Sequence, residues 1–222
     1  MYKRQKKYCD VCGERIGLLG NRKLEDGNLC KDCARKLSPW FSERRNSSVN
    51  EIKRQLEYRE ENRGRVEAFH ITRTLGSGTK LLLDEDAGLF MVTSAKNIAE
   101  ANPDVLALSD VTGCTLDVEE SSKELLHEDK DGNEVSYNPP RYEYSYDFYI
   151  IVNVNNPYFN EMRFRINPNS VEISPPPSIR PGVTLRFNPE TNAEYKKYKQ
   201  LGEEIRQILV KVRDDALSLI HI

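Results

Sequence analysis

Four cysteines near the N-terminus constrain the fold of this chain more than any other feature. They form two Cys-x2-Cys pairs separated by 17 residues, at Cys9, Cys12, Cys30 and Cys33. Zinc takes four thiolates in a tetrahedron, and a Cys-x2-Cys turn brings two sulfurs onto one edge of it with little backbone strain. The spacing therefore predicts one zinc ion held by these four residues.

Four cysteine ligands predict a structural rather than a catalytic zinc, because they leave no coordination position for water or substrate. A disulfide pair and a thioredoxin-like redox motif are the alternatives. Disulfides are rare inside cells, and the redox motif has one Cys-x2-Cys in a βαβ context rather than two. The fifth cysteine, Cys114, lies in a strand-like segment, and we expect neither a ligand nor a nucleophile there.

The residues around the cysteines predict a small head at residues 1–45. Gly13 directly after the first pair allows the positive φ that closes the turn. Turn signals at Gly20-Asn21 and Asp26-Gly27 indicate a hairpin between the pairs. A short helix is expected after the second pair and must stop before Pro39. A head of this size folds only with its metal. Knuckle, hairpin and helix in this order resemble treble-clef zinc folds.

A helix is predicted to link the head to the rest of the chain, over residues 46–65. Ser48 and Glu51 form a capping box, and the helical spacing of apolar residues continues to about Gly64. We expect a solvated spacer with one buried stripe. Its charged outer face is predicted to comprise Glu51, Lys53, Arg54, Glu57, Arg59 and Glu60.

Short strands and one long helix are predicted for the body, residues 66–222, which makes the fold class α+β. The strand candidates are residues 66–75, 79–83, 88–93, 105–108, 114–118, 142–154 and 161–166. A final helix is predicted from about Pro189, with an apolar stripe that runs from Tyr195 to Val212. About seven strands closed by one helix resemble a pleckstrin-homology-like barrel.

The head also resembles a bacterial family of four-cysteine domains of unknown function. The likeness rests on four segments of the head, with weaker support from residues 82–86 and 102–105 of the body. The four are Cys-Asp-Val-Cys-Gly from Cys9, Ile-Gly-Leu-Leu from Ile16, Lys-Leu-Glu-Asp-Gly from Lys23 and Cys-Lys-Asp-Cys-Ala from Cys30. The resemblance implies zinc for the four cysteines and brings no activity with it.

Charge separates the head from the body. Residues 1–45 hold 12 Lys and Arg against 6 Asp and Glu, a net +6, and the remainder carries a net −8. The basic segment with Lys3, Arg4, Lys6 and Lys7, flanked by tyrosines, is typical of nucleic-acid contacts. The acidic body would repel a long polyanion, so we expect a protein partner first and nucleic acid as the alternative.

No membrane contact is expected from the sequence. The longest apolar runs fall far short of the ~20 residues that span a bilayer, and only Arg73 and Lys80 flank the first strand turn, where a phosphoinositide would bind. No apolar stretch follows the basic start, so we expect no secretory signal and a cytoplasmic location.

Catalytic candidates are few. His70 lies beside Phe69 in a predicted strand, and His127 lies in an acidic loop. The glycine-rich segment at residues 76–80 lacks the phosphate-loop pattern, and residues 129–134 lack the calcium-loop spacing. We therefore predict a non-enzymatic adaptor with a zinc head and a binding barrel.

Overall fold

The computed structural model describes residues 6–174 and 188–220, with side chains described up to Lys211. The chain divides into two compact units. The first, here called the cysteine unit, comprises Met1–Thr74, Leu82–Thr112 and Asn153–Met162. The second, the hairpin unit, comprises Leu75–Leu81, Gly113–Val152 and Arg163–Ile222. The domain boundaries expected near residues 45 and 65 stay predictions. None of the helices in the described part of the chain is both long and apolar enough to cross a membrane.

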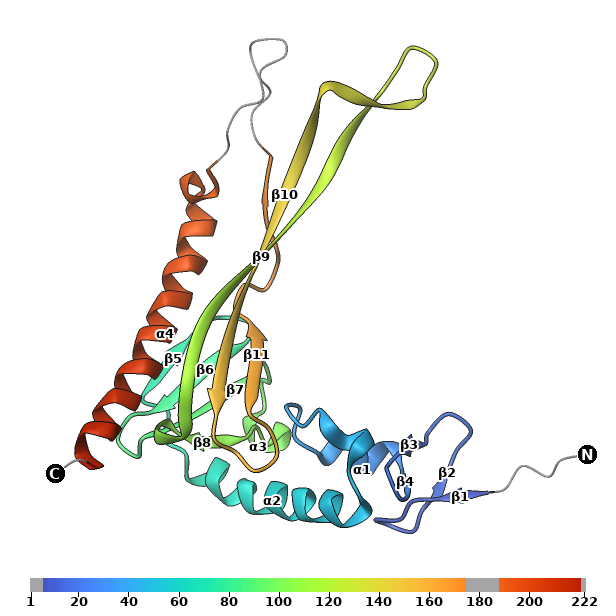
Figure 1. The fold of residues 1–222 in the computed structure, drawn as a ribbon, viewed down its shortest axis with the longest axis vertical. Helices are drawn as coiled ribbons and strands as arrows, with labels where there is room; N and C mark the ends of the chain where they lie inside the picture. The colour runs from blue at the N-terminus through green and yellow to red at the C-terminus, as the bar shows by residue number, and fades with distance from the viewer. Residues whose placement is uncertain (1–5, 175–187, 221–222) are drawn as a thin grey trace, which may run out of the picture. The chain divides into compact units, whose positions relative to one another are not determined.

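The head consists of two small hairpins and a short helix (Figure 1). Its elements are β1 (Lys7–Tyr8), β2 (Arg15–Ile16), β3 (Arg22–Lys23), β4 (Asn28–Leu29), α1 (Lys31–Lys36) and the 3-10 turn η1 (Glu43–Asn46). β1 pairs antiparallel with β2, and β3 with β4. The head core joins three of the cysteines to Ile16, Leu24, Leu29, Leu37 and Ile52. The predicted hairpin between the cysteine pairs is therefore present as β3–β4.

Helix α2 (Val49–Ala68) begins at the predicted capping box. The Ser48 side chain accepts a hydrogen bond from Glu51 N, and the Glu51 carboxylate accepts one from Ser48 N. The helix continues past Gly64 to Ala68, so the expected end near Gly64 and the expected strand start at Val66 were wrong. Val66 is buried with Leu82 and Val105, and this packing outweighs the poor helix propensity of glycine.

A four-stranded sheet follows, in the order β5-β6-β7-β8. Its strands are β5 (Arg73–Leu75), β6 (Lys80–Asp84), β7 (Leu89–Thr93) and β8 (Val105–Ala107), close to the predicted ranges apart from the start of the first. Gly76 and Gly88 adopt positive φ at the predicted turns. Helix α3 (Ile98–Ala101) lies between β7 and β8 in the chain.

The hairpin unit is built on two long strands, β9 (Val111–Glu128) and β10 (Glu134–Val154). β10 pairs with β9, and β11 (Glu161–Arg165) and β12 (Val171–Ile173) also pair with it. Side chains of β10 alternate as predicted along its second half, where Tyr146, Phe148, Ile150 and Val152 are at most 3% exposed. Tyr142, expected on the same buried face, is 40% exposed.

Helix α4 (Ala193–Ile220) covers part of this unit (Figure 1). Tyr195 packs edge-on against Tyr146 and Phe148, with ring centroids 5.0 Å apart in both pairs. Ile205 and Leu209 are fully buried, as the predicted stripe requires, whereas the side chain of Val212 lies outside the described residues. Gly202 allows close approach, because a Cβ there would lie 2.5 Å from Leu116 Cδ1.

The expected closed barrel is not formed. In the described residues, the strands of the body belong to two four-stranded sheets that are hydrogen-bonded separately. A barrel needs unbroken pairing around its circumference. The 3-10 turn η2 (Leu108–Asp110) separates β8 from β9, and β9 pairs with β10 instead. The fold is a mixture of helices and sheets with an N-terminal cysteine cluster, and the pleckstrin-homology-like resemblance receives no support.

Candidate metal centre

The first cysteine pair lies in the tight loop between β1 and β2. Cys9 N donates to Glu14 O (2.9 Å), and Gly13 N donates to Cys9 O (2.8 Å). Gly13 has a φ of +75°, which confirms the expected use of glycine at this turn. These bonds fix the loop so that Cys9 and Cys12 face the second pair.

The second pair lies at the start of α1. Cys30 caps this helix, and its sulfur accepts a hydrogen bond from Cys33 N at 3.3 Å. The free N–H groups of a helix start favour negative charge on a sulfur placed there. The predicted position of Cys30 and Cys33 at a helix N-terminus is thus correct.

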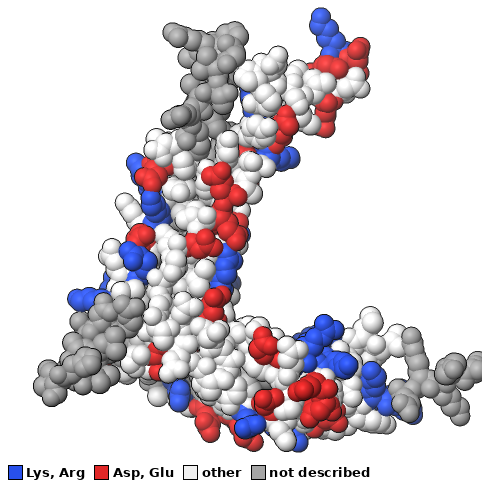
Figure 2. Space-filling view, in the orientation of Figure 1, with Lys and Arg blue, Asp and Glu red and all other residues white. Residues whose placement is uncertain are grey.

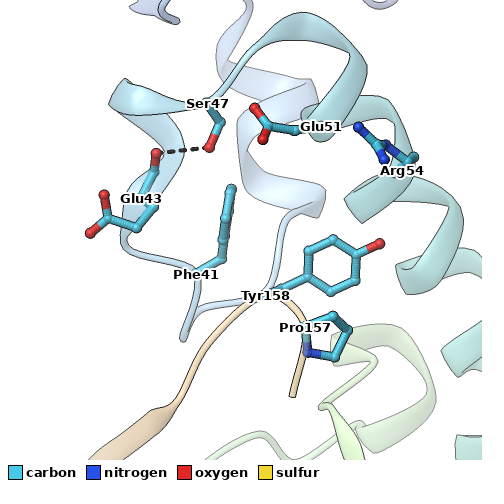
Figure 3. A pocket seen from close by; sticks show the side chains of 7 residues that line it. All are labelled: Phe41, Glu43, Ser47, Glu51, Arg54, Pro157 and Tyr158. Carbon is cyan, nitrogen blue, oxygen red and sulfur yellow. Dashed lines mark hydrogen bonds between the residues drawn. The ribbon is translucent and has the colours of Figure 1, made fainter. Parts of the chain in front are cut away.

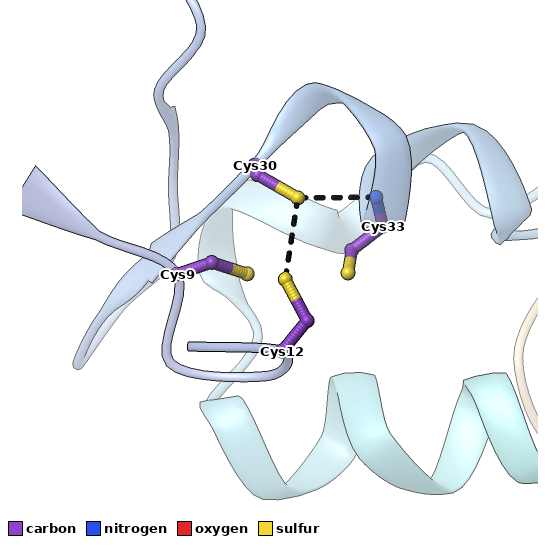
Figure 4. A group of neighbouring side chains, drawn as sticks. All are labelled: Cys9, Cys12, Cys30 and Cys33. Carbon is purple, nitrogen blue, oxygen red and sulfur yellow. Dashed lines mark hydrogen bonds between the residues drawn. The ribbon is translucent and has the colours of Figure 1, made fainter. Parts of the chain in front are cut away.

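The four sulfurs converge on one point (Figure 4). All lie within 4.8 Å of one another, and Cys12 Sγ is 3.7 Å from Cys30 Sγ. This separation is far beyond an S–S bond of about 2.05 Å. It is close to the edge of about 3.8 Å expected for a tetrahedron with Zn–S bonds of about 2.3 Å. The cluster can hold a metal ion, and its donor set is consistent with zinc.

Burial differs among the four cysteines. Cys9, Cys30 and Cys33 are buried, whereas Cys12 is exposed. Burial opposes ionisation of Cys9, but hydrogen bonds from the backbone N–H groups of Cys12, Cys30 and Val11 and from the Cys12 thiol together outweigh it and lower the pKa of Cys9 to about 7. Burial and the neighbouring sulfur of Cys30 raise the pKa of Cys33. Four adjacent sulfurs cannot all ionise without a compensating charge, which a divalent cation supplies.

Cys114 is not a member of the cluster. It lies on β9 in the hairpin unit, and burial raises the pKa of its thiol to about 12. A second group in the described residues could also hold an ion, formed by His70, Asp84 and Asp86. The Asp84 carboxylate there accepts hydrogen bonds from His70 N and Ala87 N, which lower its pKa. We assign the two aspartates a structural role at the turn between β6 and β7, to which His70 is joined through its backbone N–H.

A buried polar network supports the metal-bearing helix, and the sequence analysis missed it. Arg59, expected on the solvated face of α2, is only 7% exposed. Its guanidinium donates to Asp104 Oδ1 (2.8 Å), to Lys36 O at the end of α1 (3.2 Å), and to Asn102 O. Burial raises the pKa of Asp104, and the charge of Arg59 opposes that rise.

The network continues through side chains on both sides of this ion pair. Ser38 Oγ donates to Asp104 Oδ2 (2.8 Å). Asn62 Nδ2 donates to Asn102 Oδ1 (2.8 Å), and Asn102 Nδ2 donates to Arg59 O (2.8 Å). One signal in the sequence could have revealed it, because the spacing of Ile52, Gln55, Arg59, Asn62 and Val66 continues one helical stripe.

An aromatic pocket lies elsewhere in the cysteine unit (Figure 3). It is lined by Phe41, Glu43, Ser47, Glu51, Arg54, Pro157 and Tyr158. The Phe41 and Tyr158 rings are perpendicular, with centroids 6.4 Å apart, and Tyr58 lies 5.0 Å from Tyr158 on a tilted plane. The Glu51 carboxylate accepts hydrogen bonds from the backbone N–H and the hydroxyl of Ser48. These hydrogen bonds lower the pKa of Glu51 and so favour its charged form.

The predicted nucleic-acid residues are only partly described. Lys6 and Lys7 are exposed on and next to β1, whereas Lys3 and Arg4 lie outside the described residues. On the face drawn in Figure 2, basic and acidic side chains are interspersed over the head, and acidic ones follow the long hairpin of β9 and β10. Arg44 lies near Arg22 and Arg45, and its pKa is lowered by burial and by these charges.

Residues 7–55 match the model of a family described as Domain of unknown function (DUF4428). The match covers the four cysteines and the first turns of α2, which is well under half of the chain. No curated protein and no solved structure matches the chain. The head is thus similar to a domain family of unknown function, and the match carries no activity to this protein.

Proposed function

We propose that this protein is a non-enzymatic interaction protein whose head is folded by one structural zinc ion. The convergence of four cysteine sulfurs within 4.8 Å carries the proposal. Four thiolate ligands complete the shell, so the metal would hold the loop of Cys9 to helix α1 and leave no site for a reactant. The order of knuckle, hairpin and helix supports a treble-clef-like arrangement.

The roles of the other reactive side chains support a non-enzymatic protein. His70 lies 3.8 Å from Asp86 with both side chains largely exposed. His127 packs on Tyr137, with ring centroids 4.6 Å apart. The Cys114 thiol, with a pKa of about 12, is not an activated nucleophile. Free thiols that must bind metal also favour a reducing compartment, which supports a cytoplasmic location.

A metal assay tests the zinc proposal. We expect one zinc per chain in protein purified without chelator, and loss of that zinc with Cys12→Ser. Cys114→Ser is the matched control and should keep the metal. The hairpin unit of the Cys12→Ser variant should retain its own unfolding transition, because its core of Tyr146, Phe148 and Ile205 contains none of the four ligands. Zinc-free wild-type protein would refute the proposal.

The aromatic pocket supports a protein partner for this adaptor. Perpendicular rings with carboxylates nearby suit a cationic side chain, because the ring faces and the carboxylates all attract positive charge. The positive charge of Arg54 offsets only one of the two negative charges of Glu43 and Glu51, so the pocket keeps a net negative charge. We therefore propose that a Lys or Arg side chain of a partner protein binds in this pocket, beside the Phe41 and Tyr158 rings.

Affinity capture with nuclease treatment tests this surface. A specific protein partner should be lost with Tyr158→Ala and retained with Tyr142→Ala, which removes an exposed tyrosine from the hairpin unit. If both variants captured the partner equally well, the pocket would not be its binding site.

Nucleic acid remains the second candidate, favoured by the clustered guanidinium groups of Arg22, Arg44 and Arg45. Binding through four to six phosphates would give a log–log salt slope of about −3 to −5. Neutralising Lys3, Arg4, Lys6 and Lys7 together would then flatten the slope. Tight, sequence-selective oligonucleotide binding by the full chain would favour this candidate over a protein partner.

A further inference from the structure

The most exposed large apolar side chains in the described part of the chain lie side by side at the tip of one turn in the head. Leu18 is 78% exposed and Leu19 is 88% exposed. They are the central residues of a turn that is closed by a hydrogen bond from Gly20 N to Gly17 O (3.1 Å). A closed turn with glycine at both ends holds the two leucines outward as one small apolar protrusion.

These leucines do not serve the core of the head. The neighbouring apolar residues Ile16, Leu24 and Leu29 are at most 8% exposed and fill that core. A single exposed leucine is ordinary on a protein surface. Polar residues would form this turn equally well, so the turn itself does not require leucine. Two adjacent exposed leucines at its tip therefore indicate a contact with another molecule.

Positive charge surrounds the protrusion. Arg22 Nη1 donates to Leu19 O (3.3 Å), so a guanidinium lies at the base of the turn. The β1–β2 register places Lys7 opposite Ile16, the residue just before the turn. No Asp or Glu occurs from Arg15 to Leu24. None of Lys7, Arg15, Arg22 and Lys23 takes part in an ion pair within the described residues.

We propose that this tip docks the protein on an anionic membrane surface. The two leucines would enter the boundary of the acyl chains, and the surrounding cations would stay at the level of the lipid phosphates. Exposed Tyr8, opposite Arg15 in the β1–β2 pair, adds an aromatic ring suited to the same interface. The sequence-based expectation of no membrane contact considered only a spanning segment and the turn between Arg73 and Lys80.

A membrane fits this surface better than a protein or nucleic acid. A stable protein interface needs about 800 Å² from each partner, far more than two leucines offer. Nucleic acid would use the cations and leave the leucines without a role. A lipid surface accepts a small apolar protrusion with cations around it. The contact should be weak and reversible, because it lacks the second anchor that stable attachment requires.

Vesicle flotation with the full-length, zinc-loaded chain tests the proposal. Binding to phosphatidylcholine vesicles with about 30% phosphatidylserine should exceed binding to pure phosphatidylcholine by about tenfold or more. Leu18→Ser/Leu19→Ser should lose about tenfold or more of the binding to the anionic vesicles. The matched control Ile71→Ser/Leu126→Ser removes two other exposed apolar residues and should bind as the wild type does.

A fluorescence measurement gives a positive signal that does not depend on loss of binding. In Leu18→Trp, emission should shift to the blue when anionic vesicles are added, whereas Leu126→Trp should not change. Absence of wild-type binding, or a double leucine variant that binds within about twofold of the wild type, would overturn the proposal. Zinc content is measured on every variant, so a failure to bind lipid leaves the zinc proposal separately testable.

Discussion

Arg59 Nη1 lies 2.8 Å from Asp104 Oδ1 in the interior of the cysteine unit, and the two side chains are 8% and 0% exposed. The pair joins helix α2 to the segment before β8. Through Lys36 O it also holds the end of the helix that carries Cys33. Helix α1, which carries Cys33, is therefore stabilised by an ion pair that lies outside the two hairpins of the head.

Breaking this ion pair should destabilise the cysteine unit strongly. Arg59→Ala leaves Asp104 buried and unpaired, and we expect a loss of about 3–5 kcal/mol in the free energy of unfolding, measured with urea. Removing both partners should cost less than the sum of the single changes. Arg63→Ala breaks the exposed pair with Glu60 and should cost less than about 1 kcal/mol. Equal losses for Arg59→Ala and Arg63→Ala would contradict this account.

Trp40 should report on metal loss. Its backbone N–H donates to Ser38 Oγ (3.1 Å), which donates to Asp104, and its indole nitrogen is buried. If removal of zinc frees helix α1, this environment opens and emission moves to longer wavelength. A chelator titration followed by fluorescence, with zinc measured in parallel, checks the shift. Unchanged emission after demonstrated metal loss would show that Trp40 is independent of the head.

Alkylation should separate the four ligand cysteines from Cys114. In the zinc-bound protein we expect iodoacetamide to modify few cysteines, because metal-bound thiolates are blocked. After chelation the head should unfold and expose its four cysteines to the reagent, whereas Cys114 stays buried in the hairpin unit and should not react. Its pKa of about 12 leaves only roughly one thiol in ten thousand ionised at pH 8. Intact mass spectrometry counts the additions, and urea should release the fifth. Five additions after chelation alone would mean that the hairpin unit opens with the head.

Gly202 should tolerate no larger side chain while Leu116 is present. A Cβ there would lie 2.5 Å from Leu116 Cδ1, so Gly202→Val should cost about 1–3 kcal/mol through overpacking. Leu116→Ala should recover part of this loss, which a double-mutant cycle in urea measures as a favourable coupling. Gly64→Val is the control, because a Cβ at Gly64 would meet nothing within 4 Å. Additive losses would show that the two residues do not interact.

Local features of the sequence predicted local structure well. The cysteine spacing, the glycine after the first pair and the capping box at Ser48 each depend on neighbours a few residues away, and all appear as predicted. The buried role of Arg59 depends on Asp104, 45 residues further along the chain, which no local pattern encodes. A charged residue on a partly charged helix looks solvated until its partner is known.

The long hairpin was underestimated for a related reason. Between residues 119 and 128 few side chains of β9 are well covered, so the alternation of apolar and polar residues that marks a half-buried strand is missing there. Backbone pairing continues the strands, with exposed cross-strand contacts such as that of His127 with Tyr137. The barrel was expected from the number and order of strands, and neither determines which edges pair.

The backbone conformation and the hydrogen bonds of Asn102 together limit which residues can replace it. Its backbone is left-handed, with a φ of 48°, a conformation that glycine adopts most readily and asparagine tolerates. Its amide also completes the contacts with Asn62 and Arg59. Glycine would adopt the left-handed conformation but lose the hydrogen bonds to Asn62 and Arg59. Glutamine would keep an amide group but strain the backbone. Few substitutions preserve both properties, so this position should vary little even where surrounding surface residues drift freely.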